Sequence, residues 1–272
     1  MNKSWLSLNI YSDSDKHEII SSYFDSFSLG NQFMKDHFIV YLPLDYKNIA
    51  GKVLDNIHDQ YDIKFNWKEI EHENWMSNWK KNFTPVNIKD TVLIVPDSDN
   101  SKNDFLYTIK INPAMAFGTG HHASTQLMIE NMLEYNIKKY SKVLDLGCGS
   151  GILSILAKKM GVQNILALDN DPVCEDNFVE NCNLNKVDGI KLVIDDVHKF
   201  ADYNYDVILA NINKNNVIKI IEKFEMLNSK AILIVSGLLD SDLAEIENKL
   251  KQSCIEKIKQ QEEWISLVIK NK

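Results

Sequence analysis

The sequence contains no arginine, so all thirty of its cationic side chains are lysines. A site that recognises a carboxylate or a phosphate through the bidentate guanidinium fork is therefore excluded. Cations are also outnumbered, since 38 aspartate and glutamate residues leave a formal net charge of −8. This balance argues against a protein that coats nucleic acid, because such a protein needs a basic face. It suits an enzyme that acts on a basic protein or an amine.

Cysteine is scarce as well, with four residues in the chain: Cys148, Cys174, Cys182 and Cys254. None belongs to a Cys-x-x-Cys pair, and no group of cysteines and histidines has zinc spacing, so we expect no metal site. We also expect no disulfide framework, because four reduced thiols are typical of a cytoplasmic protein.

Long apolar runs are missing too. The longest, such as residues 231–235, have the length of a buried strand and do not approach a bilayer span. The opening residues MNKSW are followed by polar residues and not by the apolar segment of a signal peptide. We therefore expect a cytoplasmic protein without a membrane segment.

The composition is that of a globular protein. Of the 272 residues, 44% are hydrophobic and 25% are charged. These fractions exclude a disordered chain and provide enough apolar side chains for a core without disulfides. The length corresponds to one large domain or to two ordinary ones.

The beginning of the chain predicts a small α+β domain over residues 1–65. Strands are predicted at residues 5–10, 38–42 and 61–65. Apolar residues at helical spacing predict two helices on one face of this sheet: Ile19, Ile20, Tyr23, Phe24 and Phe27, then Ile49, Val53, Leu54 and Ile57. Residues 66–84 place tryptophans among charged residues, which favours an amphipathic connector helix over a surface on which nucleic acid bases stack.

The remainder, residues 85–272, predicts a second domain of the α/β class. Two strands, at 91–95 and 106–111, flank a polar loop. Further strands then alternate with helical patterns: residues 143–146, 165–168, 190–194, 207–210 and 231–235. Such alternation is typical of a Rossmann-like, mostly parallel sheet that is covered on both faces. Two apolar segments near the end, at 254–258 and 265–269, predict an antiparallel hairpin at the edge of the sheet.

A glycine-rich turn is the strongest local motif. Residues 143–152 read VLDLGCGSGI, an apolar strand that runs into a turn and then into a helix. In open α/β sheets, ligands bind outside the carboxyl ends of the strands. Gly147 and Gly149 let the backbone approach a ligand with no Cβ in the way. Gly151 is expected to let the helix pack close to the strand.

Acidic residues at three successive strand ends indicate which ligand binds. Asp145 precedes the turn, Asp169 ends the second strand and Asp196 follows the third. A carboxylate such as Asp169 can accept both hydroxyls of a ribose, and Asp196 falls where an adenine edge would lie. Asp145 would repel a pyrophosphate but attract an ammonium group, and the turn departs from the G-x-G-x-x-G spacing. These features favour S-adenosyl-L-methionine as the cofactor over NAD, which stays as the alternative.

Two further segments are candidates for the reaction site. Asn211 ends the fourth strand, where the reactive methyl group would point. A neutral amide can orient an amine through its carbonyl oxygen, although an asparagine before a helix also commonly caps it. Residues 118–125 place His121 and His122 side by side. We expect these histidines to have a loop or capping role, with a catalytic base as the alternative.

Together these motifs resemble the ribosomal protein L-eleven methyltransferase family. The resemblance rests on residues 117–121 (FGTGH), the turn at 145–151, Asp169 and residues 210–212 (ANI), with weaker matches at 75–85 and at 263–264. It spans residue 66 to the C-terminus, and the first domain matches in size and element order. It implies a class I methyltransferase domain with a mostly parallel seven-stranded sheet, preceded by a small substrate-recognition domain.

The resemblance also implies an activity. The family transfers methyl groups from S-adenosyl-L-methionine to lysine ε-amines and the N-terminal α-amine of one large-subunit ribosomal protein, the eleventh. Its cofactor contacts carry over to Thr125, Gly147, Asp169 and Asn211, and Asn211 is the expected catalytic residue. We expect a monomer without direct binding to nucleic acid or membranes. Residues 212–216 (INKNN) and His122 depart from the family pattern and leave the substrate range open.

Other functions stay open on the sequence alone. The chain could methylate another protein, an RNA or a small molecule, or it could be a non-catalytic ribosome-assembly factor of the same fold. An RNA enzyme would be expected to carry a basic, arginine-bearing appendage, which this sequence lacks.

Overall fold

The structure is a computed structural model that describes residues 5–13, 16–24, 27–34, 36–70, 83–112, 118–137, 142–227 and 229–272. Its contacts divide the chain into two compact units, Met1–Asn82 and Phe83–Lys272. Each unit has its own sheet and its own apolar core.

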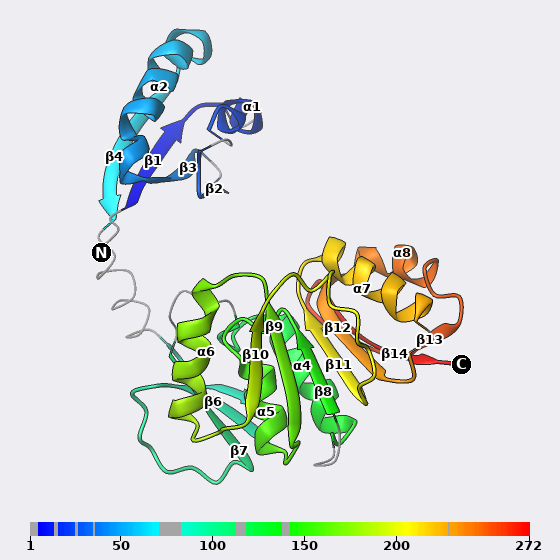
Figure 1. Cartoon of the computed structure of the whole chain (residues 1–272). Helices are drawn as coiled ribbons and strands as arrows, with labels where there is room; N and C mark the ends of the chain where they lie inside the picture. The colour runs from blue at the N-terminus through cyan, green and yellow to red at the C-terminus, as the bar shows by residue number, and fades with distance from the viewer. Residues whose placement is uncertain are drawn as a thin grey trace. The chain divides into compact units, whose positions relative to one another are not determined.

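The N-terminal unit is a four-stranded antiparallel sheet with two helices (Figure 1). Its main elements are β1 (Trp5–Tyr11), α1 (His17–Ser22), β2 (Gly30–Phe33), β3 (Phe38–Pro43), α2 (Lys47–Tyr61) and β4 (Lys64–Ile70). The strand order is β2-β3-β1-β4. Leu6, Leu8 and Ile10 lie on one face of β1 and are buried with Ile20 of α1 and Leu54 of α2. Both helices therefore cover the same face, as the sequence predicts.

Strand β4 corrects the predicted connector. It begins three residues later than expected and continues to Ile70, which pairs with Trp5 of β1. Trp67 packs on the apolar core of the N-terminal unit. Residues 66–70 are therefore strand and not connector helix, because an edge strand with one covered face also mixes aromatic and charged residues. The rest of the predicted connector, residues 71–82, lies outside the described residues.

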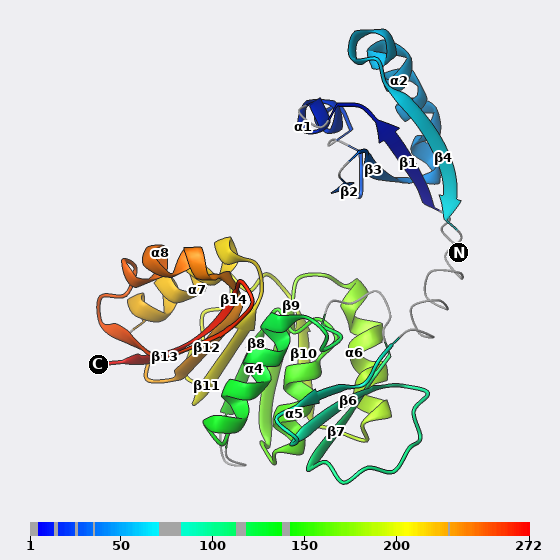
Figure 2. The ribbon, with the colours of Figure 1, turned by 180° about the vertical axis from the view of Figure 1, so that it is seen from behind.

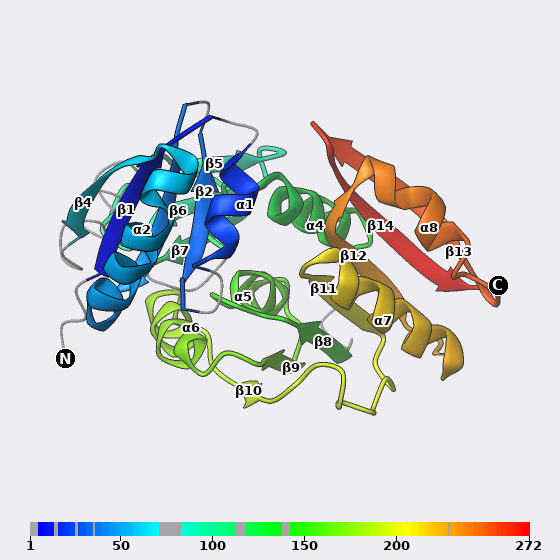
Figure 3. The same ribbon diagram turned by 90° about the horizontal axis from the view of Figure 1, so that it is seen from above.

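The second unit is built on the seven-stranded sheet that the family resemblance implies. Its main elements are α4 (Ala123–Glu134), β8 (Lys142–Leu146), α5 (Ile152–Lys159), β9 (Asn164–Asp169), α6 (Val173–Leu184), β10 (Ile190–Ile194), β11 (Val207–Asn211), α7 (Lys214–Met226), β12 (Ile232–Leu239), α8 (Leu243–Glu247), β13 (Ser253–Gln261) and β14 (Trp264–Asn271). The strand order is β10-β9-β8-β11-β12-β14-β13 and can be followed in Figure 3. All neighbours are parallel except β14, which pairs antiparallel with β12 and with β13. The predicted terminal hairpin is confirmed.

Alternate side chains of the sheet point into two apolar layers. Val143 of β8 and Leu209 of β11 are buried in the layer that contains α4 and α5. Their chain neighbours Leu144 and Ile208 are buried in the opposite layer with α7 and α8. Figure 2 shows α4 and α5 in front of the sheet. Among the described residues, no helix is both long and apolar enough to cross a membrane.

A small sheet covers part of the α5 side. It contains β5 (Val86–Ile88), β6 (Val92–Pro96) and β7 (Tyr107–Ile111) in that order. The two strands expected around the polar loop do pair with each other, and they run parallel. Ile94 and Ile109 join the same apolar cluster as Leu153 of α5.

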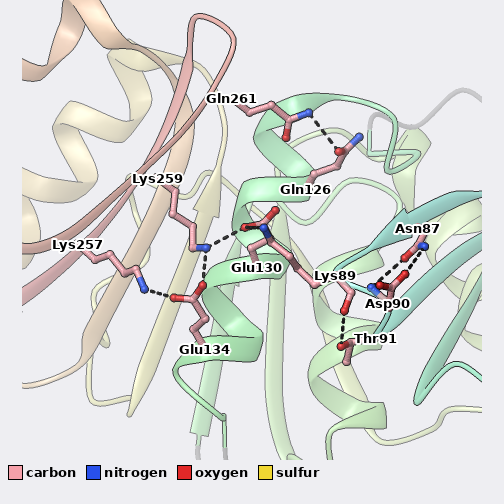
Figure 4. A network of polar contacts seen from close by, with 10 residues as sticks. All are labelled: Asn87, Lys89, Asp90, Thr91, Gln126, Glu130, Glu134, Lys257, Lys259 and Gln261. Carbon is pink, nitrogen blue, oxygen red and sulfur yellow. Dashed lines mark hydrogen bonds and ion pairs between the residues drawn. The ribbon is translucent and has the colours of Figure 1, made fainter.

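Charged side chains fix α4 between this small sheet and the terminal hairpin (Figure 4). Glu130 and Glu134, one turn apart, accept hydrogen bonds from Lys259 of β13 at 2.8 and 2.5 Å. Glu130 also lies 3.4 Å from the ammonium of Lys89, in the turn between β5 and β6. Because Lys259 is only 13% exposed, water screens its ion pairs less than those of surface lysines. These contacts hold the helix whose first turn carries Thr125.

Candidate active site at the carboxyl ends of the strands

The strand order brings the predicted site residues to one edge of the sheet. Strand β8 lies between β9 and β11, so the connections leave it in opposite directions, which is where open α/β sheets bind ligands. Asp169 and Asn211 are the last residues of β9 and β11, and Asp196 lies two residues beyond β10. Asp145 is the penultimate residue of β8 and lies two residues before Gly147, the first glycine of the turn.

The glycine turn is held by hydrogen bonds from its backbone. The amides of Gly147 and Cys148 donate to the carbonyl of Leu168 at 2.8 and 2.9 Å. Gly147 has φ +77°, and a Cβ there would lie 2.2 Å from Cγ2 of Ile212. Glycine is therefore required at this position both by the backbone conformation and by the close approach of the β11–α7 loop.

Gly151 is required for a different reason than the sequence predicts. Its φ is +80°, and a Cβ there would lie 2.7 Å from the ring of Phe178 on α6. The close neighbour is therefore a helix that follows β9, and not the strand that precedes the turn.

Asp169 supports the turn from the neighbouring strand. Its Oδ2 accepts the Gly149 amide at 2.8 Å, and its Oδ1 accepts the Asp171 amide at 3.0 Å. Each carboxylate oxygen has a second lone pair, so this half-buried side chain can still accept hydroxyl groups of a ligand. Asp169 thus has two possible roles: it holds the Gly149 amide of the glycine turn, and it offers acceptor atoms for a ligand at the same edge of the sheet.

Asp145 is buried with half of its carboxylate unsatisfied. The side chain is 1% exposed, and its Oδ2 accepts the Ser154 hydroxyl at 2.6 Å. Its Oδ1 is buried and has no hydrogen bond from a described residue. Burial, with a smaller contribution from the charge of Asp169, raises the pKa of Asp145 to about 6. An anion of this kind fits a ligand with an ammonium group, which would supply the missing counter-charge.

Asp196 and Asp171 each close a loop through a side-chain oxygen. Oδ1 of Asp196 accepts the His198 amide at 2.9 Å and closes the turn after β10. Oδ1 of Asp171 accepts the Val173 amide at 2.9 Å just before α6.

Asn211 meets Thr125, a residue 86 positions earlier in the chain. Nδ2 of Asn211 donates to Oγ1 of Thr125 at 3.1 Å, and Thr125 is completely buried. This bond directs the amide so that its carbonyl oxygen Oδ1, which receives no hydrogen bond from the described residues, is left to accept one. The alternative that Asn211 caps the next helix is wrong, because Asn213 caps α7 by accepting the Asn216 amide at 3.2 Å.

Gly237 is a site residue that the sequence analysis did not single out. It lies in β12 at a shift of register between Val235 and Leu238. Its φ is +83°, and a Cβ there would lie 2.0 Å from the carbonyl oxygen of Ile212. An isolated glycine inside an apolar strand is a signal of a bulge or a close backbone approach, and it was available in the sequence.

The residues that depart from the family pattern have structural partners. Asn213 caps α7, and Lys214 lies 2.9 Å from Asp242 and 2.8 Å from Glu245 near α8. These ion pairs raise the pKa of Lys214 to about 12, so it stays charged. These departures therefore cap α7 and join its first residue to acidic side chains at and just before α8.

The two histidines have the loop and capping roles that the sequence favours. His122 caps α4, accepting the Ser124 amide at 3.3 Å, and its ring lies edge-on to Trp264 at 4.5 Å. His121 is exposed; its Nε2 lies 2.9 Å from the carbonyl of Thr84, and its ring lies edge-on to Phe83 at 4.4 Å. Phe117, part of the same family motif, lies outside the described residues.

Two cysteines and Asp169 gather beside the glycine turn. The sulfurs of Cys148 and Cys174 and a carboxylate oxygen of Asp169 all lie within 4.8 Å of one another. The hydrogen bond between the thiols raises the pKa of Cys148 and lowers that of Cys174. These donors could hold a soft metal ion, and cysteine spacing gave no sign of them because only the fold brings α6 to the turn. The expected absence of a metal site stays a prediction.

Comparisons with known proteins agree on one family. Residues 7–272 match the family model described as ribosomal protein L11 methyltransferase (PrmA). A protein named ribosomal protein L11 methyltransferase from Listeria monocytogenes serotype 4a (strain HCC23) is 35% identical over 219 residues, covering 76% of this chain and 68% of that one. Another of that name from Thermosipho melanesiensis is 37% identical over 222 residues, covering 80% and 83%.

A solved structure agrees as well. The crystal structure of a ribosomal protein L11 methylase from Lactobacillus delbrueckii subsp. bulgaricus matches with a TM-score of 0.64 at 29% identity. The match covers 70% of this chain and 100% of that one.

Proposed function

The chain belongs to the ribosomal protein L11 methyltransferase family, and from that premise we propose that it methylates ribosomal protein L11 with S-adenosyl-L-methionine. The acceptors are lysine ε-amines and the N-terminal α-amine. The observation that carries the proposal is the edge of the sheet where the glycine turn and Asp169 lie beside Asn211 and Thr125. One half of this edge suits the methyl donor, and the other suits the amine.

The donor half has a group for each part of S-adenosyl-L-methionine. The cofactor supplies a methyl group on a sulfonium, a leaving group already activated by its charge. Gly147 and Gly149 would let the backbone approach the cofactor closely, and Asp169 would accept the ribose hydroxyls. Asp196 would lie at the adenine edge, and the buried, unsatisfied Oδ1 of Asp145 would supply a counter-charge to the ammonium group. Thr125 contributes by orienting Asn211.

The amine half must present a neutral nucleophile. A free lysine has a pKa of about 10.4, so deprotonating it at pH 7 costs roughly 4–5 kcal/mol. Burial beside the cofactor's positive charge lowers that pKa, so no dedicated base is required. Oδ1 of Asn211 accepts a hydrogen bond from the amine and aligns its lone pair with the methyl group.

The proposal also covers substrate recognition. The N-terminal unit, with its sheet covered on one face, recognises ribosomal protein L11. The enzyme is further proposed to act as a monomer in the cytoplasm. The chain is acidic and its partner is a protein, so direct binding to nucleic acid is not part of the reaction.

Mass spectrometry of the acceptor tests this proposal. Recombinant ribosomal protein L11 is incubated with the full chain and S-adenosyl-L-methionine, and digestion locates the modified amines. We expect L11 to gain whole methyl groups on lysines, and Asn211→Ala to slow this gain. A parallel incubation replaces L11 with whole ribosomal subunits. Methyl groups gained there by ribosomal RNA and not by protein would identify an RNA methyltransferase, and no transfer to any ribosomal component would favour a non-catalytic assembly factor.

A further inference from the structure

Ser150 joins the glycine turn to two other segments. Its hydroxyl donates to the carbonyl of Gly118 at 2.6 Å, and its own carbonyl accepts Nδ2 of Asn181 on α6 at 2.9 Å. Ser150 is 1% exposed and Asn181 is completely buried. A Cβ on Gly118, whose φ is +103°, would lie 2.9 Å from Oγ of Ser150. The contact between these two loops is therefore both hydrogen-bonded and tightly packed.

Asn181 belongs to a row of asparagines on α6 that pairs with the end of β7. Oδ1 of Asn181 accepts the Asn112 amide at 2.8 Å, and Nδ2 of Asn177 donates to the Asn112 carbonyl at 3.2 Å. One turn further along, Asn185 accepts the Lys110 amide at 2.9 Å and donates to the Lys110 carbonyl at 2.6 Å. The row supplies the backbone partners that a neighbouring strand would otherwise give to the edge strand β7.

We propose that Ser150 and Asn181 are positioning residues that set the glycine turn in the geometry that binds the methyl donor. The proposal rests on the proposed function, since it concerns the same cofactor. Asn181 is the only member of the row, among the described contacts, that reaches the glycine turn itself. The turn is thereby held at two successive residues, at Ser150 by Asn181 and at the Gly149 amide by Asp169.

The second bond of Ser150 extends this control toward the acceptor amine. Gly118 lies a few residues before α4, whose buried Thr125 holds Asn211. A turn that is fixed before the cofactor arrives loses less conformational entropy when the cofactor binds. Removing either bond should therefore weaken cofactor binding by more than the loss of one distant buried hydrogen bond would.

Asn185 provides a matched control for Asn181. Asn181 lies in α6 and Asn185 is its C-cap; both are buried, and both accept a backbone amide and donate to a backbone carbonyl. Asn185, however, contacts only β7 and its own helix, and no described hydrogen bond joins it to the glycine turn. Asn181→Ala and Asn185→Ala should lower stability by similar amounts. A difference in cofactor affinity between them then reflects the contact of Asn181 with the glycine turn and not a general loss of packing.

The test compares these two variants of the full chain by titration calorimetry with S-adenosylhomocysteine. We expect similar falls in melting temperature, but Asn181→Ala should weaken the affinity at least about tenfold and Asn185→Ala less than about threefold. In methyl transfer to L11, Asn181→Ala should raise the KM for the cofactor more than it lowers kcat. Equal affinities in the two variants would overturn the assignment of Asn181.

A second pair keeps the test decisive if Asn181→Ala does not fold. Ser150→Ala removes the hydroxyl bonded to Gly118, and Ser229→Ala removes a buried hydroxyl that donates to the Tyr203 carbonyl at 3.1 Å, away from the turn. Weakened binding in Ser150→Ala alone supports the proposal, and equal binding in both contradicts it. If the unmodified chain binds no S-adenosylhomocysteine, the proposed function itself fails.

Discussion

The two halves of the proposed active site are built in different ways. The donor half, around the glycine turn, is fixed by backbone amides that donate to Leu168 and to Asp169. The acceptor half ends in a side chain, Asn211, that is oriented by one hydrogen bond to Thr125. The donor half is thus held by several hydrogen bonds of its own backbone, while the acceptor half depends on one contact between two side chains.

Ile212 is where the two halves touch. Its side chain occupies the space that a Cβ on Gly147 would need, and its carbonyl occupies the space that a Cβ on Gly237 would need. The halves therefore have separate tasks but share one packed residue. A change to a side chain should affect one half, whereas a change at Ile212 or its glycines should affect both.

Gly237→Ala tests that shared packing and should have the largest effect. A Cβ 2.0 Å from a backbone carbonyl, at φ +83°, should lower the free energy of unfolding by at least about 3 kcal/mol. Urea unfolding measures the change, and both cofactor binding and turnover should fall together. The control is Gly51→Ala in α2, where no atom lies within 4 Å and a gain of about 0.5–1 kcal/mol is expected. A stable Gly237→Ala protein would show that Ile212 can move aside.

Asn211→Ala isolates the acceptor half. Loss of the amide should lower kcat on the order of 100-fold, because the amine is no longer aligned. Affinity for S-adenosylhomocysteine, measured by calorimetry, should change less than about threefold. Asn213→Ala, two residues along, removes only the cap of α7 and should cost about 1 kcal/mol of stability with little effect on kcat. Equal losses of affinity and turnover in Asn211→Ala would mean that this amide only binds the cofactor.

Asp169→Asn isolates the donor half. The variant keeps the shape of the side chain but loses the charge and one acceptor, so affinity for S-adenosylhomocysteine should fall about tenfold to hundredfold. Calorimetry measures the affinity, with Asp171→Asn in the adjacent loop as the matched control. Unchanged affinity would refute the ribose role of Asp169.

A smaller effect is expected from the pH dependence of Asp145. Its pKa is raised to about 6 by burial, so at pH 5 only about one tenth of the side chain is ionised. A ligand ammonium binds the ionised form, so affinity for S-adenosylhomocysteine should rise about tenfold between pH 5 and pH 7. Asp145→Asn should abolish this rise. A wild-type affinity that falls or stays level over this range would contradict the pairing of Asp145 with the ammonium.

Much of the fold could be predicted from the sequence. Strand and helix alternate with clear periods from β8 onward, and the terminal hairpin was evident from two apolar segments without a helix between them. The predicted connector helix is wrong over residues 66–70 because Trp67 packs on the core from an edge strand. Such a strand cannot be told from an amphipathic helix by its composition alone.

The site was predicted less completely. Position in the strand–turn–helix pattern was enough to select the glycine turn, Asp145, Asp169 and Asn211 as one edge of the sheet. Contacts between distant segments could not be read in this way. The hydrogen bond from Asn211 to Thr125 and the close approach of Gly237 to Ile212 both join residues that are far apart in the chain. No repeating pattern of residue types in the sequence indicates such contacts.

Calorimetric titration of Asp169→Asn and Asn211→Ala side by side, each with turnover measured on the same preparation, tests the division between the two halves most directly. We expect opposite profiles, with Asp169→Asn losing mainly affinity for S-adenosylhomocysteine and Asn211→Ala losing mainly methyl transfer. Matching profiles for the two variants would contradict it.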